Sequence, residues 1–182
     1  DEPLSNLAAR LRLQTREELR SIQRETGITT VFVTHDQEEA MSISDMIVVM
    51  KKGVLQQMGR PQQVYDDPRN LFVAKFLGTP PINVLEGRVE NGKVYIGNEA
   101  VLSAELSDQP VYVGIRPEGF ALDEKGPFTC SLSRVEVMGR DRSIIMDHDC
   151  SLSGSLRAII SSETQVKEDP LVRFSLKPGK VF

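Results

Sequence analysis

The sequence of 182 residues lacks tryptophan, has only two cysteines and is poor in aromatic residues. No apolar run approaches the roughly 20 residues that a membrane-spanning helix needs. The first residues are Asp1-Glu2-Pro3, which differ from the basic and hydrophobic regions of a signal peptide. Cys130 and Cys150 do not form a CxxC spacing, so the sequence favours neither a metal cluster nor a disulfide framework. We interpret both cysteines as reduced packing residues.

A surplus of basic residues is also missing. The 22 Lys and Arg residues are outnumbered by 26 Asp and Glu residues, which gives a formal net charge of −4. Basic residues are interleaved with acidic ones, so we expect no nucleic-acid partner. Hydrophobic residues make up 40% of the chain and charged residues 26%, which predicts a folded protein with one domain or two small ones.

The first 80 residues have the pattern of an α/β domain. The spacing of leucines predicts an amphipathic helix over residues 8–25, and residues 29–34 read as a strand buried on both faces, as in a parallel sheet. Asp36 is suited to cap a short helix that follows. A second buried strand over residues 46–50 is expected to turn at 51–53 into a hairpin. Two short helices are predicted at about 61–65 and 71–77, the first with proline in its first turn.

The pattern changes at Gly78-Thr79-Pro80-Pro81, because paired prolines cannot continue a helix. We therefore place the domain boundary here, with residues 1–80 in the first domain and 81–182 in the second. Short runs of β-branched residues separated by turns predict a small all-β barrel or sandwich for the second domain. These runs are residues 84–89, 93–96, 111–115, 129–137, 143–146, 155–160 and 171–176.

Candidate chemistry lies at Asp1-Glu2 and His35. One carboxylate of the acidic pair can hold Mg²⁺ while the other orients water for attack. His35 follows the predicted buried strand, and ligand sites in open α/β sheets lie at such strand ends. Two solvated acids and a local packing histidine are the alternative interpretation of the same residues. An acidic pair at a strand end needs the strand before it, so we also expect that the sequence continues upstream of Asp1.

Several motifs in order resemble those of one family. Residues 1–7, Asp-Glu-Pro-Leu-Ser-Asn-Leu, resemble the end of the Walker B motif and the D-loop of ABC ATPases. Residues 34–41 are similar to the H-loop, and residues 45–78 to the end of the nucleotide-binding domain of sugar-importer ATPases. Residues 113–118, Val-Gly-Ile-Arg-Pro-Glu, resemble a signature of the OB-like regulatory domain called TOBE.

This resemblance implies a partial P-loop NTPase domain of the α/β class followed by an all-β TOBE domain. It implies that Asp1 coordinates Mg²⁺, Glu2 is the catalytic base, and His35 contacts the γ-phosphate of ATP. Ser5 and Asn6 would lie in the D-loop at the dimer interface. Ala8 stands where the family usually has Asp, which concerns the coupling of the two ATP sites rather than the fold.

The resemblance also implies partners and a location. The intact protein would hydrolyse ATP as a dimer with a second ATPase subunit, below a transmembrane permease that receives solute from an external binding protein. It would be cytoplasmic and peripheral on the inner face of the membrane. The imported solute is expected to be a carbohydrate, with polyamines, phosphate esters and metal ions as alternatives.

The sequence lacks two motifs that such a site requires, namely a Gly-rich phosphate loop followed by a helix and an LSGGQ-type signature. Residues 87–93 do match GxxxxGK, but Val94 replaces the required Ser or Thr and Asn91-Gly92 indicates a hairpin turn. We therefore expect these 182 residues alone to be inactive, with neither ATP nor Mg²⁺ bound. A second hypothesis is a non-catalytic module for regulation, dimerisation or small-ligand binding.

Two further clusters have structural interpretations. The side chains of Asp147-His148-Asp149 would alternate between faces of a strand, so a solvated turn is favoured over a metal site. Arg116-Pro117-Glu118 lies at a strand end, where a structural role in a salt bridge between the two domains is favoured over a ligand contact.

Overall fold

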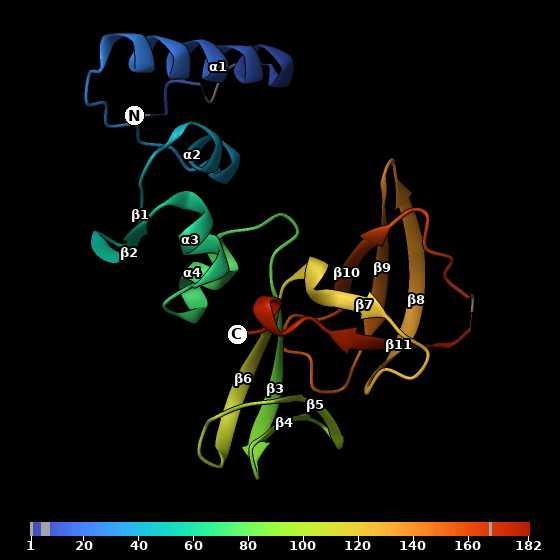
Figure 1. Cartoon of the computed structure of the whole chain (residues 1–182). Coiled ribbons are helices and arrows are strands. Elements are labelled where there is room, and N and C mark those ends of the chain that lie inside the picture. The colour runs from blue at the N-terminus through green and yellow to red at the C-terminus, as the bar shows by residue number, and fades with distance from the viewer. Residues whose placement is uncertain (1, 5–7, 168) are drawn as a thin grey trace. The chain divides into compact units, whose positions relative to one another are not determined.

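The computed structural model describes residues 2–4, 8–167 and 169–182, and the chain forms two compact units (Figure 1). The first unit is Asp1–Gly78 and the second is Thr79–Phe182. The first unit holds four α-helices and one hairpin, and the second consists of antiparallel sheets, among the described residues. In this part of the chain, no helix combines the length and apolar character needed to cross a membrane.

The helices of the first unit begin and end at residues suited to those positions. Helix α1, Ala9–Thr26, ends at Gly27, whose φ of 64° is left-handed and whose N–H bonds to the carbonyl oxygen of Gln23. Helix α2, Gln37–Ile43, is capped by Asp36, whose side chain accepts hydrogen bonds from two backbone N–H groups of the first turn. Both predicted helices are confirmed.

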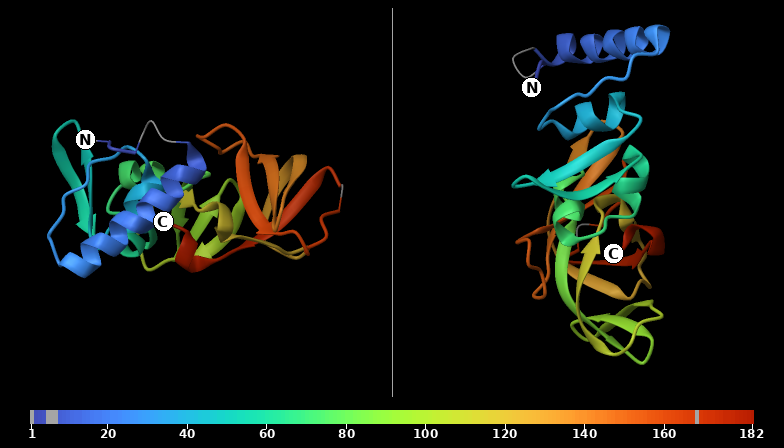
Figure 2. Two further views of the ribbon diagram at one scale, coloured as in Figure 1. Left: turned by 90° about the horizontal axis from the view of Figure 1, so that it is seen from above. Right: turned by 90° about the vertical axis from the view of Figure 1, so that its left-hand side faces the viewer.

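The strand predicted at residues 29–34 is wrong. This segment is a coil between α1 and α2, and Figures 1 and 2 draw it without an arrow. Val31 is 87% exposed and Val33 is 52% exposed. Among the described residues, the N–H of Glu2 bonds to the carbonyl oxygen of Val33, but no strand pairs with the segment. An extended segment becomes a sheet strand only where neighbours complete its ladder.

The predicted hairpin forms from β1, Ile47–Lys51, and β2, Val54–Gly59. Lys52 and Gly53 turn the chain with φ values of 49° and 79°. The prediction that the first strand is buried on both faces is wrong, because Val48 and Met50 are about half exposed, whereas Ile47 is buried. The sequence cannot distinguish one buried face from two when both faces are apolar.

Helices α3, Pro61–Asp66, and α4, Leu71–Phe76, cover the buried face of this hairpin and confirm the two short predicted helices. Together they form a small core of Ile47, Val49, Val64, Val73 and Leu77. The side chain of Asn70 caps α4 by accepting a hydrogen bond from the N–H of Val73.

The second unit contains a four-stranded and a five-stranded antiparallel sheet. The first has the order β5-β4-β3-β6 and the second has the order β10-β9-β8-β11-β7. The bounds are β3 Asn83–Glu90, β4 Lys93–Ile96, β5 Glu99–Ser103, β6 Gln109–Ile115, β7 Phe120–Leu122, β8 Phe128–Met138, β9 Asp141–Asp147, β10 Leu156–Ser161 and β11 Leu171–Leu176. Short 3-10 helices occupy Pro117–Gly119 and Pro178–Lys180. Each of the seven predicted β segments overlaps a strand of this unit.

One apolar core joins the two sheets of the second unit. At its centre the ring of Phe120 lies 5.3 Å from that of Phe174 and 6.1 Å from that of Phe128. Cys130 is 2% exposed in the same core, as expected for a packing residue. The last strand, β11, lies inside its sheet between β8 and β7, pairing antiparallel with both.

Asn83 links the two sheets of the second unit. Its side chain is buried at 3% exposure. The side-chain amide donates to the carbonyl oxygens of Ile115 in β6 and Arg157 in β10, both at 2.9 Å. Its side-chain oxygen accepts a hydrogen bond of 2.7 Å from the N–H of Arg157. A single polar side chain thus satisfies backbone groups of strands in different sheets.

Candidate functional site

The structure brings together two of the residues predicted from the sequence, Glu2 and His35. The Nδ1 atom of His35 lies 2.6 Å from Oε1 of Glu2, and the backbone N–H of Glu2 bonds to Val33 at 2.8 Å. The His35 side chain is 70% exposed and that of Glu2 is 44% exposed, so both remain open to solvent and to a ligand. Asp1, Ser5 and Asn6 lie outside the described residues.

The contact between these side chains changes the charge state of the imidazole. The hydrogen bond and the negative charge of Glu2 raise the pKa of His35 above its usual value, and Asp36 and Glu39 add to this effect. A raised pKa favours the imidazolium near neutral pH. The pair is therefore an anionic carboxylate beside a hydrogen-bond donor that can carry positive charge, a combination that can accept a proton from water and donate to a phosphate oxygen.

The segment that carries His35 is held by contacts of Asp36 with the first turn of α2 and with two arginines of α1. Partial burial acts to raise the pKa of Asp36, but N–H donors from Glu39 and Glu38 and the charges of Arg16 and Arg12 outweigh it, so that the pKa is lowered. Asp36 is therefore an ionised cap at the N-terminus of α2.

Arg12 and Arg16 are residues that the sequence reasoning missed. They lie four residues apart on α1 and hence on one face of that helix, and both guanidinium groups reach Asp36. The sequence signal for them is this spacing of two arginines in the helix predicted over residues 8–25. Charged residues on an amphipathic helix usually face solvent, whereas Arg16 is only 7% exposed.

The described residues do not supply a metal site by themselves. Among them, no group of three or more His, Cys, Asp and Glu side chains is placed to hold an ion. Asp1, the predicted Mg²⁺ ligand, lies outside this part of the chain. The described donor set therefore does not hold an ion by itself.

The match to a phosphate loop at residues 87–93 is a hairpin, as predicted. Strands β3 and β4 pair antiparallel across Asn91-Gly92, with Val89 opposite Val94. Both turn residues have positive φ, 51° and 72°. A phosphate loop would instead lead into a helix whose N-terminus points at the anion.

The residues at 147–149, considered above as metal ligands, make packing and turn contacts. The ring of His148 stacks on Phe128 at 5.1 Å, and its Nδ1 accepts a hydrogen bond from the N–H of Cys150. Asp147 ends β9 and accepts hydrogen bonds from the hydroxyls of Ser133 and Ser155. Asp147 and His148 are therefore engaged in contacts within the protein.

Arg116 is fully buried and lies over the ring of Phe182 at 5.7 Å. Its neighbour Glu118 lies 3.7 Å from the ammonium group of Lys180. Each of these contacts joins residues of the second unit. Residues 116–118 therefore make packing and ion-pair contacts within the second unit, and the predicted salt bridge between the domains stays a prediction.

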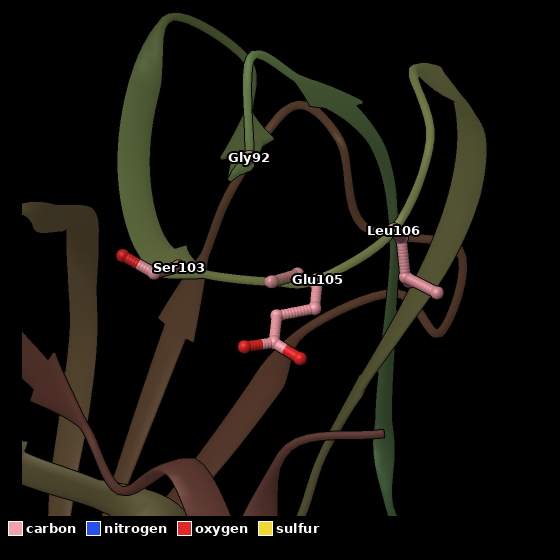
Figure 3. A pocket seen from close by; sticks show the side chains of 5 residues that line it. Gly92, Ser103, Glu105 and Leu106 are labelled. Carbon is pink, nitrogen blue, oxygen red and sulfur yellow. The ribbon is translucent and has the colours of Figure 1, made fainter.

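The second unit has a concave surface that is a candidate for small-ligand binding. It is lined by Gly92, Ser103, Ala104, Glu105 and Leu106 (Figure 3). Figure 3 shows the side chains of Glu105 and Leu106 directed away from each other. One carboxylate, one hydroxyl and one large apolar side chain do not converge on a common point, which gives little support to the hypothesis of a ligand-binding module.

Comparison with known proteins gives a consistent set of relatives, although no family model matches the chain. The chain is 38% identical over 184 residues to the sn-glycerol-3-phosphate import ATP-binding protein UgpC of Jannaschia sp. (strain CCS1). This alignment covers 100% of this chain and 52% of that protein. It is 48% identical over 132 residues to the diacetylchitobiose uptake system ATP-binding protein MsiK of Streptomyces coelicolor, covering 68% of this chain and 35% of the relative.

A third relative is archaeal. The trehalose/maltose import ATP-binding protein MalK of Thermococcus litoralis is 50% identical over 129 residues, which are 65% of this chain and 35% of that protein. The chain thus spans about half the length, or less, of the curated relatives it matches. The alignment along the whole chain, together with motifs in the expected order, shows that it belongs to the family of ATP-binding subunits of ABC importers.

Proposed function

We propose that this chain is part of the ATPase subunit of an ABC importer, in which Glu2 and His35 act at the ATP site. The observation that carries the proposal is the 2.6 Å contact between His35 Nδ1 and Glu2 Oε1. It occurs in a chain that aligns over its whole length with about half of an import ATP-binding protein. Glu2 is the candidate for accepting the proton of the attacking water, and His35 is the candidate for donating to the γ-phosphate.

ATP with Mg²⁺ is the proposed cofactor of the whole protein, with Asp1 as the metal ligand and Ser5 and Asn6 in the loop facing a second ATPase subunit. When bound, the ion would neutralise charge on the phosphates. Ala8, at the N-terminal cap of α1, has no side-chain acceptor for the first turn. Aspartate there would cap the helix, so Ala8 weakens the start of the helix that follows the proposed dimer-facing loop.

The second unit is proposed to be the TOBE regulatory domain. Its all-β architecture and the residues 113–118 at the end of β6 support this. The proposed partners are a second ATPase subunit, transmembrane permease subunits and, indirectly, an external solute-binding protein. The protein would then lie on the cytoplasmic face of the membrane through the permease. The names of the relatives favour a carbohydrate or a glycerol phosphate as the imported solute.

The proposal is tested in the longer protein obtained by extending the reading frame upstream of Asp1. This upstream sequence should contain an apolar strand directly before Asp1, an LSGGQ-type signature and GxxxxGK followed by Ser or Thr. The Glu2→Gln variant of that protein should lose ATP turnover while retaining ATP-dependent dimerisation. Glu17→Gln, on the exposed surface of α1, is the matched control. Unchanged turnover in Glu2→Gln would remove Glu2 from its proposed role.

The 182-residue chain provides a second test. We expect no ATP hydrolysis and no micromolar affinity for Mg-ATP by calorimetry, because its GxxxxGK match is a hairpin without a following helix. Micromolar binding would show that the chain has a phosphate site which this reasoning has missed.

A further inference from the structure

Helix α1 and the segment carrying His35 are joined by four charged side chains, which we call the arginine clamp: Arg12, Arg16, Asp36 and Glu39. Each arginine has a guanidinium nitrogen 3.2 Å from Oδ2 of Asp36. Oε1 of Glu39 lies 3.6 Å from Arg16 and 3.8 Å from Arg12. Two cations therefore share two carboxylates, and the four charges sum to zero.

The clamp is largely withdrawn from water. The side chain of Glu39 is 2% exposed, that of Arg16 is 9% exposed, and those of Asp36 and Arg12 are 22% and 28% exposed. Buried ion pairs are costly to desolvate, and replacement by apolar residues is often neutral for stability. A need for stability alone is therefore a weak explanation of this cluster, whereas a need for fixed geometry explains it better.

The clamp contacts both residues that flank His35. On one side, the hydroxyl of Thr34 donates to Oε2 of Glu39 at 2.7 Å. On the other side, Asp36 is bound directly by the arginines, and its backbone N–H donates to the same Thr34 hydroxyl at 3.0 Å. The side chain of His35 itself projects into solvent and contacts Glu2. The backbone of His35 is thus fixed from the side of α1, while its imidazole is exposed to solvent and in contact with Glu2.

We propose that Arg12 and Arg16 are positioning residues for His35, which act through Asp36, Glu39 and Thr34 to hold the imidazole on Glu2. The catalytic consequence rests on the proposed function, but the positioning itself does not.

The positioning is tested in the 182-residue chain by NMR titration of its two histidines, His35 and His148. The variants Thr34→Val and Arg12→Met should release His35 from Glu2, so that its titration midpoint falls toward the value of an ordinary histidine. Loss of the cation at Arg12 alone would move the midpoint in the opposite direction, because a removed positive charge favours the imidazolium. A fall therefore reports lost contact with Glu2.

Matched controls are available on the same elements. Thr30→Val lies in the same coil and Arg10→Met lies on the same helix, and both positions are exposed. Neither control should change the His35 midpoint, and the His148 signal should stay fixed in every variant because it lies in the second unit. An unchanged His35 midpoint in both Thr34→Val and Arg12→Met overturns the proposal.

The catalytic consequence is tested in the extended protein. Thr34→Val should lower kcat for ATP by about tenfold or more with KM changed less than about twofold, since misplacing a catalytic group by about 1 Å can cost ~100-fold. Thr30→Val should retain full turnover. If the His35 midpoint shifts in the chain but kcat is unchanged, the clamp stands and the proposed catalytic role of His35 fails. If the midpoint does not shift, the clamp fails whatever the turnover.

Discussion

Replacing Asn83 by alanine is expected to destabilise the second unit strongly, although Asn83 lies far from the candidate site in sequence. The substitution removes two donated hydrogen bonds of 2.9 Å and one accepted hydrogen bond of 2.7 Å. It also leaves backbone groups of Ile115 and Arg157 without these partners at a position that is 3% exposed. The change thus breaks a connection between β3, β6 and β10 at a single residue.

The magnitude follows from the number of bonds lost. Each contributes about 1 kcal/mol net, and a buried group left unsatisfied costs about 1–3 kcal/mol, so the free energy of unfolding should fall by about 3 kcal/mol. With a urea m-value of about 1.5–2 kcal/mol/M for a unit of this size, the midpoint should fall by about 1.5–2 M.

The assay is urea unfolding followed by far-ultraviolet circular dichroism, because the chain has no tryptophan. Thiol labelling of Cys130 in a Cys150→Ser background gives a second measure specific to the core of the second unit. Asn98→Ala, at an exposed turn between β4 and β5, is the control and should change stability by less than about 0.5 kcal/mol. If Asn83→Ala behaves like this control, the account of the link between the sheets is refuted.

Three further predictions concern other positions. Burial raises the pKa of Cys130 to about 12, so a thiol reagent at pH 8 should label Cys130 more slowly than Cys150 in the folded chain, and equal rates would contradict this. Gly126→Ala would place a Cβ 2.3 Å from the backbone of β11 and should cost about 3 kcal/mol or more by urea unfolding, whereas Gly179→Ala, with open space, should be nearly neutral. The pKa of Asp36 is lowered in the folded state below the ordinary aspartate value of 3.8. Its ionised form therefore stabilises the protein fully when the pH is above that value, and this stability is lost as pH falls through the lowered pKa. Asp36→Asn should therefore flatten the loss of stability below about pH 4, and an identical slope in both proteins would exclude this contribution.

Local patterns in the sequence predict much of the fold. Leucine spacing and Gly27 define α1, Asp36 defines the start of α2, and Asn91-Gly92 defines a hairpin. Each of these features depends on backbone chemistry within a few residues. Residues 29–34 have the composition of a strand, but a strand also needs partners, and the described residues supply only the bond from Glu2 to Val33. Composition carries no information about whether such partners are present.

The candidate site was only partly accessible to the same reasoning. His35 could be singled out because it follows an apolar run, and the structure places it against Glu2. The spacing of Arg12 and Arg16 alone does not predict the arginine clamp, because charged residues on a helix usually face solvent. Recognising that Arg16 is buried requires knowing that α1 packs against the segment around Asp36, which is a tertiary contact between residues separated by 20 positions.

The interior position of β11 has a consequence for how the second unit folds. Residues 171–176 pair with β8 on one side and β7 on the other. The five-stranded sheet therefore cannot be completed until nearly the whole chain has been made. During synthesis, β7 and β8 each keep an unpaired edge until β11 has been made. The helices and hairpin of the first unit depend instead on contacts nearer in sequence. Non-local pairing slows folding and exposes strand edges to other chains. The first unit should therefore acquire structure early. The yield of folded protein should depend on how well the incomplete sheet is protected from pairing with other chains until β11 has been made.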